Sequence, residues 1–121
     1  MQVHQKAIFE DNYVYLIEDK GNCVVIDPGE STTISKWVKE LGFNLTGIWI
    51  THHHNDHVGG VSELKDEFEC RVWGPLRSLD VIKEVDVPVS QGDKLSFGGI
   101  DIDVIETPGH TLDHVCYYVE S

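Results

Sequence analysis

The residue types best suited to chemistry in this chain are concentrated in one short stretch, "THHHNDHVGG" at positions 51–60. It holds four of the chain's seven histidines together with an aspartate. In an extended segment, residues two apart point to the same side, so His52 and His54 can face one metal ion while His53 faces away. Imidazole and carboxylate groups together suit zinc, iron or manganese. The stretch therefore predicts a metal site.

Asp56 and His57 follow after the chain has turned, and they can address a second ion close to the first. One tetrahedral ion cannot take four ligands from so short a loop and still contact the rest of the protein. Two ions that share the loop are therefore the favoured geometry. A solvated loop that is merely rich in histidine is the weaker alternative, because the run lies directly behind an apolar strand, where sites are often placed.

A second signal is "ETPGHTLDH" at positions 106–114, where a Pro-Gly turn ends a strand and His110 follows. Taken by itself, His110 would be an ordinary loop histidine. Beside the first motif, it is predicted to complete the imidazole set of the first ion with His52 and His54.

Two further residues are predicted to support the ligands. Asp27 ends the apolar run "VVIDPG", where a carboxylate can orient a ligating histidine from behind. A turn-forming aspartate before Pro-Gly is an equally good interpretation, and the two are compatible. Thr51 can form hydrogen bonds within the loop. His114 is predicted to pack or form hydrogen bonds in the next strand, while His4 and His53 are predicted to be structural or solvent-facing.

Hydrophobic periodicity and turn residues predict the elements that carry these residues. The first three strands form an antiparallel meander, with turns at Asp-Asn and Lys-Gly-Asn. A helix follows, with Ser31 or Thr32 as its cap and Gly42 as its C-terminal stop. Its apolar stripe has helical spacing. The stripe consists of Ile34, Trp37, Val38 and Leu41. The expected helices are 31–43 and 61–68. The expected strands are 1–9, 13–19, 23–29, 45–51, 70–75 and 113–120, with a hairpin at 94–110.

The hairpin shows the alternation of a half-exposed strand, because Ile100, Ile102 and Val104 alternate with Asp101 and Asp103. Strands dominate the pattern, and helices lie between them. The sequence therefore predicts an α/β or α+β fold.

Length and charge narrow the function. The 121 residues match one domain, spanning 1–121. A formal net charge of −12 argues against nucleic acid as a partner, since phosphates are bound mainly by Lys and Arg. It also argues against an anionic membrane surface. No run reaches the roughly 18 apolar residues of a membrane span. The N-terminus has no basic region before an apolar run, so no signal peptide is predicted and a cytoplasmic location is expected.

The three cysteines are far apart in sequence and form no C-x-x-C pair, so a disulfide framework is not expected. Cys23 and Cys116 lie in apolar, strand-like runs. Both are predicted to be small buried hydrophobic residues.

The order T-H-H-H-x-D-H-x-G-G, with D-P-G upstream and T-P-G-H-T downstream, resembles the metallo-β-lactamase superfamily. The flanking segments "DNYVYLIED" and "HTLDHVCYYV" are similar to glyoxalase II, the hydroxyacylglutathione hydrolase family. The resemblance covers essentially the whole chain. It implies an αββα sandwich of two similar halves, of which this chain looks like the first αβ half only.

The resemblance also implies an activity, the hydrolysis of S-D-lactoylglutathione to D-lactate and glutathione in methylglyoxal detoxification. It assigns His52, His54 and His110 to a first zinc ion, and Asp56 and His57 to a second. A metal-activated hydroxide then attacks the thioester, and Asp56 can orient it. Iron or manganese can replace zinc.

The family pattern also includes a bridging aspartate in a G-D-T-L-F-like segment, a further histidine and glutathione-binding residues, all located after the strand that ends near Val119. Because the printed sequence stops at Ser121, the resemblance predicts a truncated site with weak activity or none. It also predicts an exposed sheet face through which the chain can self-associate.

Two alternatives stay open. Other members of the superfamily are lactonases, β-lactamases, nucleases and a mononuclear-iron persulfide dioxygenase, and the charge disfavours the nucleases. The dioxygenase alternative predicts one iron, with Asp56 and His57 idle. The second alternative is a non-catalytic domain that binds one ion through three imidazoles.

Overall fold

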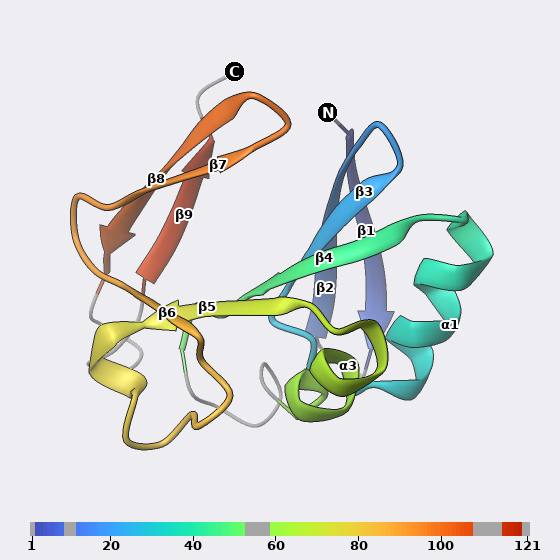
Figure 1. The fold of residues 1–121 in the computed structure, drawn as a ribbon, viewed down its shortest axis with the longest axis horizontal. Helices are drawn as coiled ribbons and strands as arrows, with labels where there is room; N and C mark the ends of the chain where they lie inside the picture. The colour runs from blue at the N-terminus through green and yellow to red at the C-terminus, as the bar shows by residue number, and fades with distance from the viewer. Residues whose placement is uncertain (1, 9–11, 53–58, 108–114, 120–121) are drawn as a thin grey trace.

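The computed structural model describes residues 2–8, 12–52, 59–107 and 115–119. These residues form three layers: two α-helices, a six-stranded sheet and a three-stranded sheet (Figure 1). The elements are β1 (Gln2–Ile8), β2 (Asn12–Asp19), β3 (Asn22–Ile26), α1 (Thr32–Leu41), β4 (Asn44–Trp49), α3 (Val61–Phe68), β5 (Arg71–Pro75), η1 (Leu76–Ser78), β6 (Val87–Val89), β7 (Lys94–Phe97), β8 (Ile100–Glu106) and β9 (Val115–Val119).

The larger sheet has the strand order β1-β2-β3-β4-β5-β6. The first three strands pair antiparallel, which confirms the predicted meander. The next pairings, β3 with β4, β4 with β5 and β5 with β6, are parallel. The change of direction follows from the connections, since a tight turn joins antiparallel strands and a helical crossover joins parallel ones. Here α1 links β3 to β4, and α3 links β4 to β5.

The smaller sheet consists of β7, β8 and β9, all antiparallel. The predicted hairpin is confirmed as β7 and β8, joined by Gly98 and Gly99. Both glycines have positive φ (60° and 77°), a conformation that a two-residue hairpin turn of this kind requires. The alternation along β8 is also confirmed: Ile102 and Val104 are buried, whereas Asp101 is exposed.

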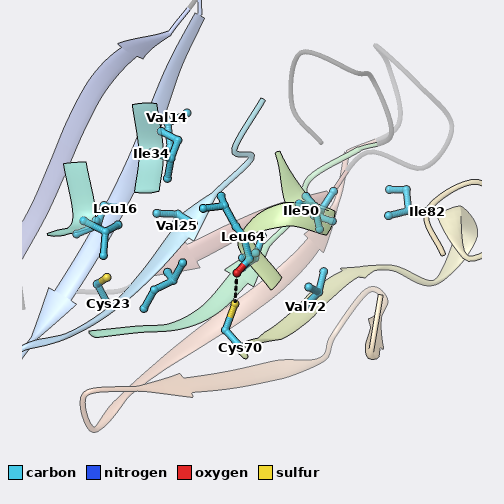
Figure 2. Packing of buried hydrophobic residues seen from close by; sticks show 14 residues of the cluster. Val14, Leu16, Cys23, Val25, Ile34, Ile50, Leu64, Cys70, Val72 and Ile82 are labelled. Atoms are coloured by element: carbon cyan, nitrogen blue, oxygen red, sulfur yellow. Dashed lines mark hydrogen bonds between the residues drawn. The ribbon is translucent and has the colours of Figure 1, made fainter. Parts of the chain in front are cut away.

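One face of the larger sheet packs on α1 and α3. The predicted apolar stripe of α1 is confirmed, with Ile34 and Val38 fully buried. Helix α1 ends at Gly42, whose φ of 75° is the left-handed conformation predicted for a C-terminal stop. Figure 2 shows the side chains that fill this layer, with Cys70 Sγ directed toward the carbonyl oxygen of Leu64 at 3.9 Å.

The start of α1 differs from the prediction. Ser31 occupies the cap position, but neither it nor Thr32 caps the helix through its side chain. Instead, Glu30 Oε1 accepts a hydrogen bond from the Thr33 N–H at 2.9 Å. The Ser31 hydroxyl donates to Glu63 Oε2 of α3 at 2.7 Å. A contact between the helices therefore takes the hydroxyl that would otherwise cap the helix.

The other face of the larger sheet packs on the smaller sheet. Trp49, Ile17 and Val24 form a cluster with Ile102 of β8. This cover does not extend over the whole face, because Val3 and Tyr15 remain 63% and 43% exposed. A partly exposed apolar sheet face was predicted, and self-association through it stays a prediction.

Two further points depart from the sequence interpretation. Cys23 is buried as predicted, but Cys116 is exposed, so its predicted burial is wrong. Successive residues of β9 face opposite sides of the sheet, and Cys116 lies on the outer one. The short elements η1 and β6 were not predicted. No helix among the described residues is long and apolar enough to cross a membrane.

Candidate metal centre

The ends of β3 and β4 bring the described part of the candidate site together. These strands are parallel neighbours, so their carboxyl ends lie at the same edge of the sheet. Asp27 follows β3, and Thr51 and His52 follow β4. This edge is where binding sites form in open α/β sheets.

The side chain of Asp27 makes the last hydrogen bond between the β3 and β4 segments at this edge. Its N–H donates to the Trp49 carbonyl oxygen at 3.0 Å, as in a regular parallel ladder. The next ladder bond would run from the Thr51 N–H to the main-chain carbonyl of Asp27. Asp27 departs from the extended strand conformation with a φ of 53°, and its carboxylate oxygen Oδ1 accepts the Thr51 N–H instead at 2.7 Å. Such a backbone conformation is uncommon outside glycine and often marks a functional site.

A chain of three side chains runs from this carboxylate to His52. The Thr51 hydroxyl donates to Asp27 Oδ2 at 2.6 Å and lies 2.7 Å from His52 Nδ1. A hydroxyl has a single proton to donate, and here it is donated in the hydrogen bond to the carboxylate. Nδ1 of a neutral His52 ring must therefore carry a proton and donate it to the Thr51 oxygen.

The resulting tautomer suits a metal ligand. With the proton on Nδ1, the lone pair of His52 is on Nε2, the atom that a metal ion can bind. His52 is only 3% exposed, and its Nδ1 is hydrogen-bonded to Thr51. Burial and this hydrogen bond together hold the ring in place. Ligating histidines usually donate their other N–H to an oxygen in this way. His52, Thr51 and Asp27 therefore fit the roles predicted for them, although metal binding itself stays a prediction.

The other predicted ligands, His54, Asp56, His57 and His110, lie outside the described residues. Within the described ranges, no group of three or more His, Cys, Asp or Glu side chains is arranged to hold a metal ion. The two-ion arrangement and the role of Asp56 therefore stay predictions from the sequence.

Strand β9 contributes two contacts that sequence reasoning missed. The Tyr117 hydroxyl donates to the Ile50 carbonyl oxygen at 2.6 Å, and the Val115 N–H donates to the Thr51 carbonyl oxygen at 2.9 Å. Burial raises the pKa of Tyr117 well above its ordinary value of 10, and the nearby Asp27 carboxylate raises it further. The phenol therefore stays protonated and acts as a donor.

The far end of the histidine-rich loop is fixed by Gly60. Its N–H donates to the Pro28 carbonyl oxygen at 2.8 Å. A Cβ at this position would lie 2.4 Å from the carbonyl carbon of Glu30, so only glycine fits. The described residue that precedes the loop, His52, thus lies near Asp27 through Thr51, and Gly60 after the loop is bonded to the turn that follows Asp27.

Comparison with known proteins gives matches along most of this chain. Residues 8–121 match the sequence pattern of the Metallo-beta-lactamase superfamily. A hydroxyacylglutathione hydrolase of Idiomarina loihiensis is 42% identical over 120 residues, which are 98% of this chain and 47% of the relative. One from Rhodopseudomonas palustris is 48% identical over 109 residues, covering 88% of this chain and 43% of the relative. This chain thus spans somewhat less than half the length of these two relatives.

The fold agrees with a solved structure as well. The crystal structure of ETHE1 from Myxococcus xanthus aligns with a TM-score of 0.84 and 30% identity, covering 98% of this chain and 54% of that one. The predicted resemblance and fold class are therefore confirmed. The pattern match alone extends over nearly the whole sequence, from the end of β1 onward, and this chain belongs to the metallo-β-lactamase superfamily.

Proposed function

We propose that this chain supplies the first metal-binding part of a hydrolase that cleaves glutathione thioesters, with S-D-lactoylglutathione as substrate and D-lactate and glutathione as products. The observation that carries the proposal is the 42% identity to a hydroxyacylglutathione hydrolase along 98% of the chain. The hydrogen-bonded chain from Asp27 to His52 supports it, because it prepares an imidazole for a metal ion.

Within this proposal, His52 binds the first ion together with His54 and His110, while Asp56 and His57 bind the second. Zinc is the first choice, and iron or manganese suits the same donors. Bound metal lowers the pKa of a coordinated water to about 7 and polarises the thioester carbonyl.

The chain's own residues supply position and orientation. Asp27 and Thr51 hold the His52 ring so that Nε2 is the atom presented to the metal. Asp56 is proposed to orient the attacking water. Because this chain spans less than half the length of the two hydrolase relatives, we expect the 121-residue polypeptide alone to hydrolyse the thioester weakly or not at all.

The test is an assay of thioester cleavage by the protein as its gene encodes it. Absorbance of the S-D-lactoylglutathione thioester is followed before chelation, after chelation and after zinc, iron or manganese is added back. The His52→Ala variant should lose bound metal and hydrolysis together. The adjacent His53→Ala variant is the matched control, since His53 is predicted to face away from the metal, and it should retain both.

The outcome also decides among the alternatives. Absence of thioester cleavage by the metal-loaded protein would refute the proposed substrate, and turnover of a lactone or a persulfide would replace it. If the protein binds a single iron ion, and the His57→Ala variant still binds it, the mononuclear dioxygenase would be favoured. Metal binding without any turnover would favour the non-catalytic domain.

A further inference from the structure

The end of β4 has an unusual set of hydrogen bonds. Ile50 and Thr51 form the stem from which the histidine-rich loop leaves the sheet. The Ile50 N–H donates to the Trp73 carbonyl oxygen of β5, and the Thr51 N–H donates to Asp27 Oδ1. The two carbonyl oxygens accept from β9, Ile50 from a side chain and Thr51 from the backbone. All four groups are thus satisfied, as buried backbone must be.

The carbonyl of Ile50 needs a side-chain donor because its strand partner has none. In a parallel ladder, a residue that donates to residue j−1 accepts from the N–H of residue j+1. Ile50 donates to Trp73, so in a continued ladder its carbonyl would accept from the nitrogen of the residue two positions later, which is Pro75. Proline has no N–H, and the ladder between β4 and β5 cannot continue.

Tyr117 fills this gap from the second sheet. Its hydroxyl oxygen lies 2.6 Å from the Ile50 oxygen, and its ring packs on Trp49 with centroids 5.3 Å apart. The ring thus rests on the last residue of β4, and the hydroxyl reaches the residue after it. Both interactions act immediately before Thr51 and His52.

We propose that Tyr117 is a positioning residue for the metal site: its hydroxyl replaces the strand hydrogen bond that Pro75 cannot make, and so fixes where the histidine-bearing segment leaves β4. The proposal rests on the metal-binding function proposed above. Tyr117 touches neither substrate nor metal in this role and acts through the backbone of Ile50.

The first test compares Tyr117→Phe with Tyr118→Phe in the protein as its gene encodes it. The phenylalanine keeps the ring on Trp49 and removes only the hydroxyl. Tyr118 is the matched control, because it is the next residue of β9, faces outward and is 53% exposed. Zinc affinity, measured by competition with a chromogenic chelator, should fall about tenfold in Tyr117→Phe. It should stay within about twofold in Tyr118→Phe, since exposed sites are usually near-neutral.

A second readout needs no metal. Amide hydrogen exchange of residues 50–52 should speed up in the metal-free Tyr117→Phe protein by about tenfold more than exchange in β1 and β2. A residue that only stabilises the fold would accelerate both regions equally. Equal acceleration, or a zinc affinity like that of Tyr118→Phe, would overturn the proposal.

A third variant tests the specific role of the missing N–H. Pro75→Ala restores a donor opposite the Ile50 carbonyl, and the φ of −58° at this position is open to alanine. Added to Tyr117→Phe, it should recover a measurable part of the lost zinc affinity and protection. No recovery would overturn the assignment of the hydroxyl to the place of the ladder bond.

These readouts separate the two proposals. If the wild-type protein fails to cleave S-D-lactoylglutathione while Tyr117→Phe still weakens zinc binding, the proposed substrate is wrong and the positioning role stands. If the wild type cleaves S-D-lactoylglutathione and Tyr117→Phe changes neither zinc affinity nor local exchange, the positioning role is wrong and the proposed substrate stands.

Discussion

Replacing Asp27 by asparagine should invert the tautomer of His52. The substitution changes one carboxylate oxygen to an NH₂ group and keeps the shape of the side chain. Asparagine also tolerates the positive φ of 53° better than most residues, so the backbone can keep its course. The change is therefore confined to which atoms donate protons.

Neither orientation of the amide can reproduce the network. If the amide oxygen stays on the Thr51 N–H, the NH₂ group faces the Thr51 hydroxyl and donates to it. The hydroxyl proton must then go to His52 Nδ1, 2.7 Å away. That puts the ring proton on Nε2, the atom meant for the metal. If the amide is flipped, its NH₂ group faces the Thr51 N–H, so two donors oppose each other. In the wild-type protein this N–H lies 2.7 Å from a carboxylate oxygen that accepts its proton.

The expected magnitude follows from the bonds that are lost. A hydrogen bond to a charged group contributes about 1.5–3 kcal/mol, against about 0.5–1.5 kcal/mol for a neutral one, so the stability should fall by about 1–2 kcal/mol. Changes in residues that orient a ligating histidine typically weaken metal binding about 10- to 100-fold. We expect zinc affinity to fall within that range.

Three measurements check this reasoning. Ring ¹⁵N NMR of His52 in the metal-free protein reports which nitrogen carries the proton, chelator competition gives zinc affinity, and urea denaturation gives the free energy of unfolding. Asp101→Asn removes the same charge from the exposed side of β8 and serves as the control. An Asp27→Asn protein with an unchanged His52 tautomer and zinc affinity within about twofold of wild type would refute the argument.

Two further predictions concern the scaffold. Burial raises the pKa of Cys23 to about 12 and that of Cys70 to about 11, so both remain neutral thiols at pH 8. Brief alkylation of the native 121-residue chain, mapped by mass spectrometry, should label the exposed Cys116 alone, and all three after denaturation. Gly60→Ala should cost more stability in urea than Gly74→Ala. The first Cβ would meet backbone at 2.4 Å, whereas the second would meet Val85 Cγ2 at 2.7 Å, a side-chain atom that can move. Equal losses would contradict this difference.

Much of the fold could be predicted from periodicity. The stripe of α1 and its stop at Gly42 depend only on nearby residues, as does the alternation of β8, and all were confirmed. The three-residue strand β6 is too short for a periodic signal and contains Pro88. The exposure of Cys116 could not be predicted from "VCYYV", because this run is apolar throughout and does not indicate which side of the strand faces outward.

The candidate site was predictable only where its chemistry is encoded locally. The spacing of the histidines indicated His52 as a metal ligand. The aspartate before Pro-Gly had two compatible interpretations, a turn former and a group that orients a ligating histidine. Tyr117 gave no such indication, because its partner is a main-chain carbonyl 67 positions away. The need for that bond arises from Pro75, on yet another strand. Contacts of this kind depend on the arrangement of strands and not on any motif.

The two sides of β4 nevertheless follow one rule. On the β3 side, Asp27 leaves the strand conformation with a positive φ, and its carboxylate accepts from the Thr51 N–H in place of its main-chain carbonyl. On the β5 side, Pro75 lacks the N–H that should donate to Ile50, and the Tyr117 hydroxyl replaces it. Both ladders thus end at the same peptide group, the one that joins Ile50 to Thr51. A central strand released from both neighbours at once would fray. Substituting side chains for the backbone on each side lets the loop turn out of the sheet while its stem stays fixed, and this is the condition that a metal-binding histidine at a strand end requires.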